Sequence, residues 1–267
     1  MKCWKLPIRV NGYLLQPERI KMHRFFVEEP QIAKDVISIT GGDVNHIKNV
    51  LRMTAGEKIC VVNGQNNKEY LCEITEICDD KVEVRICEIR ESSQELPCRI
   101  VLFQGLPKSD KMELIIQKSV ELGVSEIVPV STARAIVKLD AKKEQNKRKR
   151  WMAISESAAK QSGRMFIPEV SPVMTFAQAM EYARTLDVKL IPYELAEGMD
   201  RTRELMSQIK PGQSVGIFIG PEGGFEQSEI EKALGEGIEP VTLGRRILRT
   251  ETAGLVTLAM LVYNLER

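Results

Sequence analysis

The glycine-rich run Ile219-Gly220-Pro221-Glu222-Gly223-Gly224-Phe225 is the part of this sequence whose residue types most directly suggest chemistry. It follows the apolar run VGIF and precedes the polar run EQSEIE. Glycine is needed where the backbone bends tightly or lies directly against a ligand. The run has neither the Walker spacing nor the Gly-x-Gly-x-x-Gly dinucleotide spacing. We therefore expect either a structural turn or a loop that holds a small ligand without a phosphate cradle.

A second run, Leu243-Gly244-Arg245-Arg246-Ile247-Leu248-Arg249-Thr250-Glu251-Thr252-Ala253, combines arginines with a carboxylate and hydroxyls. An arginine stabilises a developing negative charge, and a carboxylate accepts a proton. The same residues also fit a solvated turn in which Thr250 or Thr252 caps a helix and Glu251 lies in its first turn. Both interpretations stay open at this point.

Both runs follow strands of a predicted parallel sheet. After Pro97, the apolar runs IVLF, EIVPV, VKLIPY, VGIFIG and PVTLG alternate with helical patterns at residues 111–122, 150–162 and 252–265. Strands separated by helices predict a parallel sheet that is covered on both faces. Ligands bind at the carboxyl ends of such strands, so we expect the two loops to face one cleft.

The last helical pattern carries a largely apolar face. Ala253, Val256, Met260 and Tyr263 recur there at helical spacing. Such a face suits either the core of the protein or a partner helix.

The first third of the chain follows a different pattern. The runs HRFFV, VISI, KICVVNG, EYLCEITEI and KVEVRICEI have the alternation of half-buried strands and are separated by turn residues. They predict a small β-barrel over residues 22–94. The linker RESSQELP predicts a domain boundary before an α/β domain at residues 95–267. Residues 1–21 form an amino-terminal extension without a motif that indicates its role.

The composition is typical of a soluble globular protein, with 43% hydrophobic and 28% charged residues. No uninterrupted apolar stretch is long enough to span a membrane or to act as a secretory signal, so we expect a cytoplasmic protein. The six cysteines contain no Cys-x-x-Cys pair and there are two histidines, so we expect no metal site. A net charge of +1 neither indicates nor excludes a nucleic-acid partner.

The order IGPEGGF and then LGRRILRTETA resembles the RsmE family of 16S ribosomal RNA uridine N3-methyltransferases, a branch of the SPOUT enzymes. HRFFV, HIKNVLRMTAGEKICVVNGQ, QGLPKSDKMELIIQKSVELGV and WMAISESAAKQSGR add to the resemblance, which covers most of residues 22–267. The resemblance implies an amino-terminal PUA-like barrel and a SPOUT-type α/β domain whose parallel sheet ends in a carboxy-terminal trefoil knot. It also implies a homodimer that methylates N3 of a specific uridine in 16S rRNA, within the small ribosomal subunit.

The resemblance further implies that three loops hold S-adenosylmethionine. The implicated residues are Leu190, Ile191, Pro192, Tyr193, Glu194, Gly220, Pro221, Glu222, Gly223, Gly224, Leu243, Gly244, Ile247, Leu248, Arg249, Thr252 and Ala253. A purine is well recognised by backbone amides and carbonyls, which approach closely where side chains are absent. The methyl group is already activated by its sulfonium, so the protein must mainly orient it, and no metal is required.

The nucleophile in this reaction is uracil N3, whose proton must leave before or during attack. Arg249 is the candidate that stabilises the resulting negative charge, and Glu251 is the candidate carboxylate base. A capped helix start with an Arg249–Glu251 charge pair is the alternative interpretation of these two residues.

RNA must be held through its phosphates, which calls for basic side chains. The candidate RNA-binding residues are Arg24, His46, Lys48 and Arg52 in the barrel, with Lys108, Lys111, Lys160 and Arg164 in the second half. Each of them also fits a solvated charge. The run at residues 138–150, KLDAKKEQNKRKR, has seven basic and two acidic residues and fits a solvated helix face or a nonspecific attraction for RNA.

Two other functions compete with this interpretation. A non-catalytic RNA-binding factor for ribosome assembly would have the same fold, but it gives no reason to keep the glycines of both loops. A nicotinamide-dependent oxidoreductase would need a glycine fingerprint after the first strand and an acidic residue beyond it, and neither is present.

Overall fold

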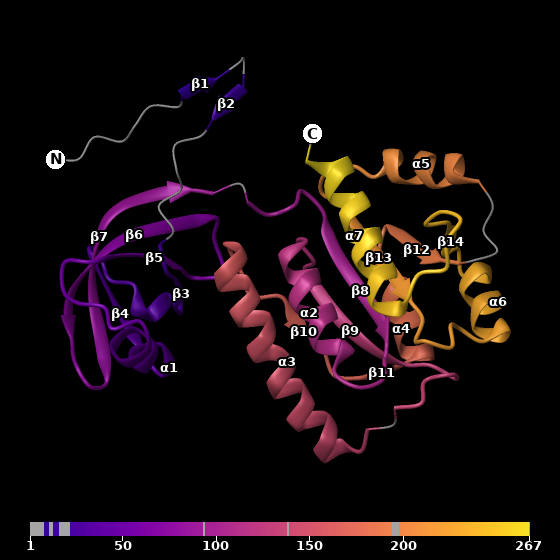
Figure 1. Cartoon of the computed structure of the whole chain (residues 1–267), viewed down its shortest axis with the longest axis horizontal. Helices are drawn as coiled ribbons and strands as arrows, with labels where there is room; N and C mark the ends of the chain where they lie inside the picture. The colour runs from indigo at the N-terminus through magenta and orange to yellow at the C-terminus, as the bar shows by residue number, and fades with distance from the viewer. Residues whose placement is uncertain are drawn as a thin grey trace. The chain divides into compact units, whose positions relative to one another are not determined.

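The computed structural model describes residues 8–10, 13–15, 22–92, 94–137, 139–193 and 198–266. Apart from a short antiparallel hairpin of β1 (Ile8–Val10) and β2 (Tyr13–Leu15), they form two compact units (Figure 1). One unit contains residues 22–62 and 69–90, and the other contains residues 63–68 and 91–266. Within this described part of the chain, no helix is both long and apolar enough to cross a membrane.

The first unit is a five-stranded sheet around one apolar core. Its elements are β3 (Arg24–Phe26), the 3-10 helix η1 (Glu29–Gln31), β4 (Val36–Thr40), α1 (Gly42–Asn45), the π-helix η2 (His46–Val50), β5 (Lys58–Val62), β6 (Lys68–Ile77) and β7 (Lys81–Glu91). The strands lie in the order β3-β5-β6-β7-β4. The core takes a buried side chain from each strand in turn, namely Phe25, Ile59, Ile74, Val84 and Ile37. The five strands predicted from the sequence are thus present.

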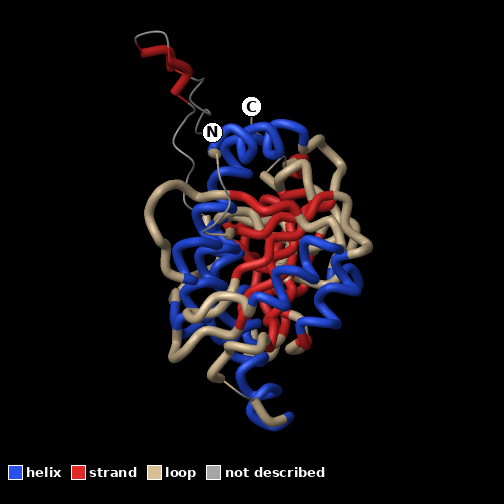
Figure 2. Tube along the Cα trace, turned by 90° about the vertical axis from the view of Figure 1, so that its right-hand side faces the viewer, coloured by secondary structure: helices blue, strands red, loops and turns tan. Residues whose placement is uncertain are grey.

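The second unit is a parallel sheet with helices on both of its faces (Figure 2). Its elements are β8 (Arg99–Gly105), α2 (Lys111–Glu121), β9 (Glu126–Ser131), α3 (Ala141–Ser162), β10 (Glu169–Val170), β11 (Met174–Thr175), α4 (Phe176–Ala183), β12 (Val188–Pro192), α5 (Met199–Gln208), β13 (Ser214–Ile219), α6 (Gln227–Gly235), β14 (Glu239–Val241) and α7 (Thr250–Leu265). The strand order is β10-β9-β8-β13-β12-β14, with β11 also paired to β9. Every one of these pairings is parallel, as predicted.

The central strand β8 shows how the two faces are covered. Val101 and Phe103 lie in the apolar cluster that α4 and α6 complete on one face. Leu102 and Gln104 point to the other face, where Gly254 of α7 comes close to both of them. Because side chains of a strand alternate between faces, the polar Gln104 is placed on the buried α7 side.

Helix α3 begins earlier than predicted. It starts at Ala141 rather than at residue 150, because the side chain of Asp140 accepts a hydrogen bond from the backbone N–H of Lys143 (2.8 Å) and caps the helix. The basic run is therefore part of a helix of 22 residues, which ends at Gly163 with a φ of 77°.

The predicted apolar face of the last helix is not its buried face. Helix α7 starts at Thr250 rather than Thr252, and its buried residues are Thr250, Gly254, Thr257, Leu258 and Leu261. Tyr263, which was placed on the predicted face, is 84% exposed. The helix is apolar on nearly all sides, so spacing alone did not distinguish the core side from the opposite one.

Candidate active site

The carboxyl ends of β12, β13 and β14 border a cavity of about 570 Å³. Its lining consists of Lys111, Arg134, Pro192, Tyr193, residues 219–225, Ile230, residues 242–250 and Ala253. Both runs that the sequence analysis singled out therefore contribute to one cavity, as the parallel topology predicts. Its volume lies within the range of small-molecule binding sites.

Most residues of the predicted cofactor loops line this cavity. They are Pro192, Tyr193, Gly220, Pro221, Glu222, Gly223, Gly224, Leu243, Gly244, Ile247, Leu248, Arg249 and Ala253. Leu190 and Ile191 are fully buried in β12 and belong to the core instead. Thr252 is exposed on α7 and is not part of the lining, and Glu194 lies outside the described residues. For the lining residues, binding of the cofactor stays a prediction.

The glycine-rich loop packs directly against the end of β8. A Cβ atom at Gly105 would lie 2.7 Å from both Cδ and the backbone nitrogen of Pro221, so no side chain fits at that position. The loop then turns sharply, because the N–H of Gly224 donates to the carbonyl of Pro221 (2.9 Å) and Gly224 has a φ of 67°. Gly105 therefore sets how closely β8 and the loop can approach.

A buried hydrogen-bond chain connects β8, α7 and the glycine-rich loop. The side-chain amide of Gln104 donates to the hydroxyl of Thr250 (2.9 Å), which donates to the carbonyl of Gly220 (2.6 Å). The same amide group also donates to the carbonyl of Gly105 (3.0 Å). Gln104 is fully buried, and its Oε1 has no hydrogen-bond partner among the residues that the structure describes. The sequence analysis did not single out Gln104, although a polar residue at the end of the apolar run IVLF was a usable signal.

An ion-paired cluster lies at the edge of the cavity. Nζ of Lys111, at the start of α2, is 3.0 Å from Glu222 in the loop and 3.4 Å from Glu251 in the first turn of α7. The hydrogen bond with Glu222 raises the pKa of Lys111. Burial opposes ionisation of Glu222, but hydrogen bonds from Lys111 and the backbone outweigh it and lower the pKa of that carboxyl. Lys111, which we predicted to contact RNA, is thus part of the cavity wall.

Arg249 presents an unpaired cation to the cavity. Its side chain is exposed and has no hydrogen bond or ion pair with any other described residue, while its carbonyl accepts the N–H groups of Thr252 and Ala253 (2.9 Å each). The alternative Arg249–Glu251 pair does not form, because Glu251 faces Lys111. The geometry therefore leaves Arg249 available for a substrate.

Arg134 forms a part of the cavity wall that the sequence analysis missed. It follows β9, and its guanidinium donates to the carbonyl of Gly223 (3.2 Å).

Ile247, in the loop after β14, is 88% exposed, which is unusual for a large apolar side chain. An exposed isoleucine at a cavity suits an apolar contact with a bound molecule.

Two of the predicted RNA-binding residues are almost buried in ion pairs. Arg24 pairs with Glu69, and its side chain is 9% exposed. Arg164 pairs with Glu95 (2.8 Å), donates to the carbonyl of Val120 (2.8 Å), and has a side chain that is 5% exposed. Both guanidinium groups are held by carboxylates inside their own unit and present little surface to RNA, so the RNA-binding set that we propose below omits both arginines.

The remaining predicted RNA-binding residues differ in exposure. Lys48, Arg52 and Lys108 are exposed, and Lys48 makes a solvent-exposed ion pair with a neighbouring aspartate. His46 is half-buried and packs edge-on against an aromatic ring of the core. Lys160 is only partly exposed and pairs with a carboxylate one turn earlier in α3. Their contact with RNA stays a prediction.

The described residues contain no cluster of three or more His, Cys, Asp or Glu side chains that is suited to hold a metal ion. The polar groups that line the cavity instead include backbone amides and carbonyls, the carboxylate of Glu222 and several cations. Glu251, the predicted base, pairs with Lys111 and is not part of the lining. Such a set suits an organic ligand that carries a purine and charged groups of both signs.

Comparisons with known proteins agree with this geometry. Residues 94–262 match the model of an RNA methyltransferase domain, and residues 39–87 match that of an RNA methyltransferase PUA domain. The chain is 38% identical to the Ribosomal RNA small subunit methyltransferase E of Bacillus subtilis, over 92% of this chain and 98% of that protein. It is 35% identical to the protein of the same name from Mesomycoplasma hyopneumoniae, over 89% of this chain and 97% of that protein.

Solved structures add information on the cofactor. The Neisseria gonorrhoeae Ribosomal RNA small subunit methyltransferase E bound to S-adenosyl methionine is 32% identical, with a TM-score of 0.78 over 89% of this chain and 95% of that one. A Legionella pneumophila protein with the bound cofactor SAM is 34% identical, with a TM-score of 0.81 over 91% of this chain and 97% of that one. The predicted α/β fold with an amino-terminal PUA domain is confirmed, whereas the trefoil knot stays a prediction.

Proposed function

We propose a specific reaction for this chain from the premise that it belongs to the RNA methyltransferase family of ribosomal RNA small subunit methyltransferase E. The chain is an S-adenosylmethionine-dependent methyltransferase of ribosomal RNA. Its proposed product is 3-methyluridine at one position of 16S rRNA. The proposal rests mainly on the cavity of about 570 Å³ at the strand ends. Both glycine-containing loops line it, together with Arg249, which has no partner among the described residues.

The cavity fits the cofactor by chemistry as well as by size. Gly220, Gly223 and Gly224 leave backbone groups of the loop without side chains, and Ile247 and Leu248 offer apolar contacts. Glu222 supplies a carboxylate for a ligand with positive charges. When bound, S-adenosylmethionine supplies a methyl group that is activated by a sulfonium centre.

The protein's own residues then assist the uracil. N3 of uracil loses its proton as it attacks, so negative charge develops on the base and is spread over its carbonyl oxygens. Arg249 donates to that charge, because its guanidinium is permanently protonated and has no intramolecular partner among the described residues. Glu251 accepts the proton, directly or through water, and Lys111 fixes the position of its carboxylate. The hydrogen bonds of Gln104 and Thr250 hold the glycine-rich loop at a fixed position relative to α7.

The proposed organisation follows the sequence analysis in outline. We propose that residues 22–94 form the RNA-binding barrel and residues 95–267 the methyltransferase domain, which agrees with the ranges that the two family models match. His46, Lys48, Arg52, Lys108 and Lys160 form the proposed RNA-binding set. We also propose that the enzyme acts in the cytoplasm on the small ribosomal subunit.

We also propose a homodimer joined through α7. Its half-exposed apolar face, with Val256, Met260 and the exposed Tyr263, has no cover within the described chain. The adjacent helix α2 adds the exposed Leu114. Light scattering at micromolar concentration is expected to give twice the mass of 30.2 kDa, and a monomer mass would contradict the proposal.

The reaction is tested with tritium-labelled S-adenosylmethionine. Purified protein is incubated with small ribosomal subunits or 16S rRNA, and the RNA is digested to nucleosides for mass spectrometry. We expect label in 3-methyluridine, and loss of that label with retained cofactor binding in Arg249→Ala. Label in a ribose-methylated or carbon-methylated nucleoside would refute the N3 assignment. Cofactor binding without any transfer would favour the non-catalytic assembly factor.

A further inference from the structure

A stripe of cations runs along the outer face of the first half of α3. Lys142, Lys143, Lys149 and Arg150, which we call the basic face, are all exposed. At 100° per residue they fall within a sector of about 120° on the helix surface. Trp151 is buried on another side of the helix. The face is therefore turned toward solvent.

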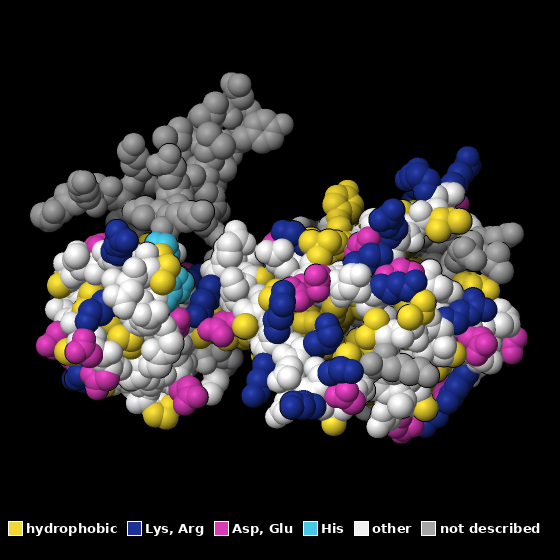
Figure 3. All heavy atoms as spheres, turned by 60° about the horizontal axis from the view of Figure 1, so that its bottom comes forward, with side chains coloured by type: hydrophobic (Ala, Val, Ile, Leu, Met, Phe, Trp, Pro, Cys, Tyr) yellow, Lys and Arg dark blue, Asp and Glu magenta, His cyan; other side chains and the backbone are white. Residues whose placement is uncertain are grey.

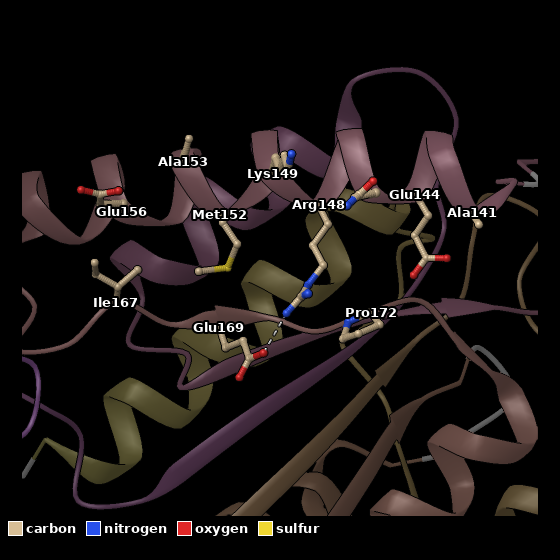
Figure 4. A pocket seen from close by; sticks show the side chains of 11 residues that line it. Ala141, Glu144, Arg148, Lys149, Met152, Ala153, Glu156, Ile167, Glu169 and Pro172 are labelled. Carbon is tan, nitrogen blue, oxygen red and sulfur yellow. Dashed lines mark hydrogen bonds and ion pairs between the residues drawn. The ribbon is translucent and has the colours of Figure 1, made fainter. Parts of the chain in front are cut away.

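The neighbouring flank of α3 carries charges of both signs. A groove of about 940 Å³ lies between α3 and the extended segment at residues 167–172, and its charged lining residues are Glu144, Glu156 and Glu169 with Arg148 and Lys149. Arg148 reaches across the groove to Glu169 (3.0 Å), as Figure 4 shows, and also donates to the carbonyl of Val170 (2.9 Å). Glu144 accepts the N–H of Val173 (2.8 Å). Carboxylates outnumber cations in this groove, so the outer face of α3 suits a polyanion better than the groove does.

The cations of the basic face are available for external contacts. Lys142 and Lys149 have no hydrogen bond or ion pair with another residue that the structure describes. Lys143 pairs with Asp140 at 3.2 Å, but its side chain is 71% exposed, and such surface pairs are weak and easily exchanged. Figure 3, which brings the amino-terminal end of α3 forward, shows Lys and Arg side chains gathered over this part of the unit.

One helix, α2, connects the basic face to the cavity. Arg150 forms an ion pair (2.8 Å) with Glu113 in the first turn of α2. Lys111, two residues earlier and therefore about 200° around the same helix, lines the cavity. RNA whose base enters the cavity would thus reach the basic face by crossing the amino-terminal end of α2.

We propose that the basic face of α3 binds the backbone phosphates of the RNA that flanks the target nucleotide. This inference rests on the proposed function and assigns RNA contact to a helix that the sequence analysis left as a solvated face or a nonspecific attractor. RNA is favoured over a lipid surface because the face carries no large apolar side chain, only Asn146 and Ala153 between its cations. Clustered cations on one helix face are the expected footprint of a phosphate backbone.

The test neutralises three cations and leaves Arg150 in place because of its contact with α2. The variant is Lys142→Gln, Lys143→Gln, Lys149→Gln. The matched control is Arg203→Gln on α5, Lys210→Gln in the loop between α5 and β13, and Lys232→Gln on α6. Binding of a fluorescein-labelled transcript of 16S rRNA is followed by anisotropy between 50 and 300 mM KCl. Each lost phosphate contact lowers the slope of log K against log salt by about 0.7 to 0.9. We therefore expect the slope to fall by about two and the affinity to fall at least about tenfold, with an unchanged slope in the control.

Two further measurements separate this inference from the proposed function. Calorimetry should give the same S-adenosylmethionine affinity in both variants as in the original chain, and methylation should show a raised KM for RNA in the α3 variant. If the original chain methylates rRNA and the α3 variant keeps its salt slope and KM, the basic face is not an RNA surface while the proposed function stands. Equal losses in the control would likewise overturn the inference, because net charge alone would then explain them. Suppose instead that the α3 variant alone loses binding to phosphatidylglycerol vesicles while its slope of log K for RNA against log salt stays unchanged. That result would overturn the inference and assign the basic face to a membrane surface.

Discussion

The hydroxyl of Thr250 is expected to connect protein stability to cofactor binding. Thr250→Val replaces it by a methyl group of similar size. The carbonyl of Gly220 then loses its donor at 2.6 Å, and the amide of Gln104 keeps only the carbonyl of Gly105 at 3.0 Å. One buried polar group without a partner costs about 1 to 3 kcal/mol. We expect the free energy of unfolding to fall by about 2 kcal/mol, and the S-adenosylmethionine affinity to fall by about tenfold as the loop loses its position.

Two controls separate the hydrogen bond from packing. Thr250→Ser keeps the donor, so it should retain most of the cofactor affinity while losing only the contribution of one methyl group. Gln104→Met removes the side-chain amide that donates to Thr250, together with the buried Oε1 that has no partner among the described residues. Because the loss of this unpaired oxygen offsets part of the cost, Gln104→Met should destabilise the fold less than Thr250→Val does. Chemical denaturation and calorimetry give the two quantities. Equal affinities for S-adenosylmethionine in Thr250→Val and in the original chain would refute the argument that this chain of hydrogen bonds positions the loop.

Three other substitutions test the cavity. Arg249→Ala should lower kcat by about a hundredfold with little change in cofactor affinity, since the lost donor acts on charge that develops during the reaction. A normal rate of single-turnover methylation in Arg249→Lys would show that the reaction does not need the specific geometry of the guanidinium. Gly105→Ala should destabilise the fold by about 1 to 3 kcal/mol, because the new Cβ lies 2.7 Å from Pro221; an unchanged denaturation midpoint would show that the loop shifts freely. Lys111→Met should make the protein less stable at neutral pH. The pKa of Glu222 is lowered in the fold, so this difference should shrink as acid protonates the carboxyl, and a difference in melting temperature that persists unchanged through acidic pH would contradict the ion pair.

The repeating patterns of the sequence predicted the sheets of both units, because alternation and the change from strands to helices are local properties. The shared cavity also followed from local information, since parallel strands bring their carboxyl ends to one edge. The contact between Gln104 and Thr250 was not predicted, because the two residues are 146 positions apart and nothing local marks them as partners. The ion pairs of Arg24 and Arg164, which were predicted to bind RNA, were not foreseen for the same reason, since their carboxylate partners are distant in sequence.

The choice between core and partner helix for the apolar face of α7 was left open for a different reason. Its residues are apolar on nearly every side, so Tyr263 and Leu258 fitted a buried face equally well by spacing. Gly254 does lie on the buried side, but a Cβ atom there would meet its nearest neighbours at ordinary distances of 3.6 to 3.8 Å, so the glycine does not determine which side faces the sheet. The buried side is set by contacts with β8 and β13, which are distant in sequence.

The long sequence separation within the cavity also bears on when it forms. β8 is flanked by β9, which follows it closely in the chain, and by β13, which follows more than a hundred residues later. The loop from β13 is held in place only when Thr250 has reached Gln104. Closing such long loops is slow relative to local pairing, so the first unit and the β8–β9 pair are expected to fold first. During synthesis, the capacity to bind the cofactor therefore arises only after α7 has emerged, and a chain stalled before residue 250 has no working site, however well its earlier strands are formed.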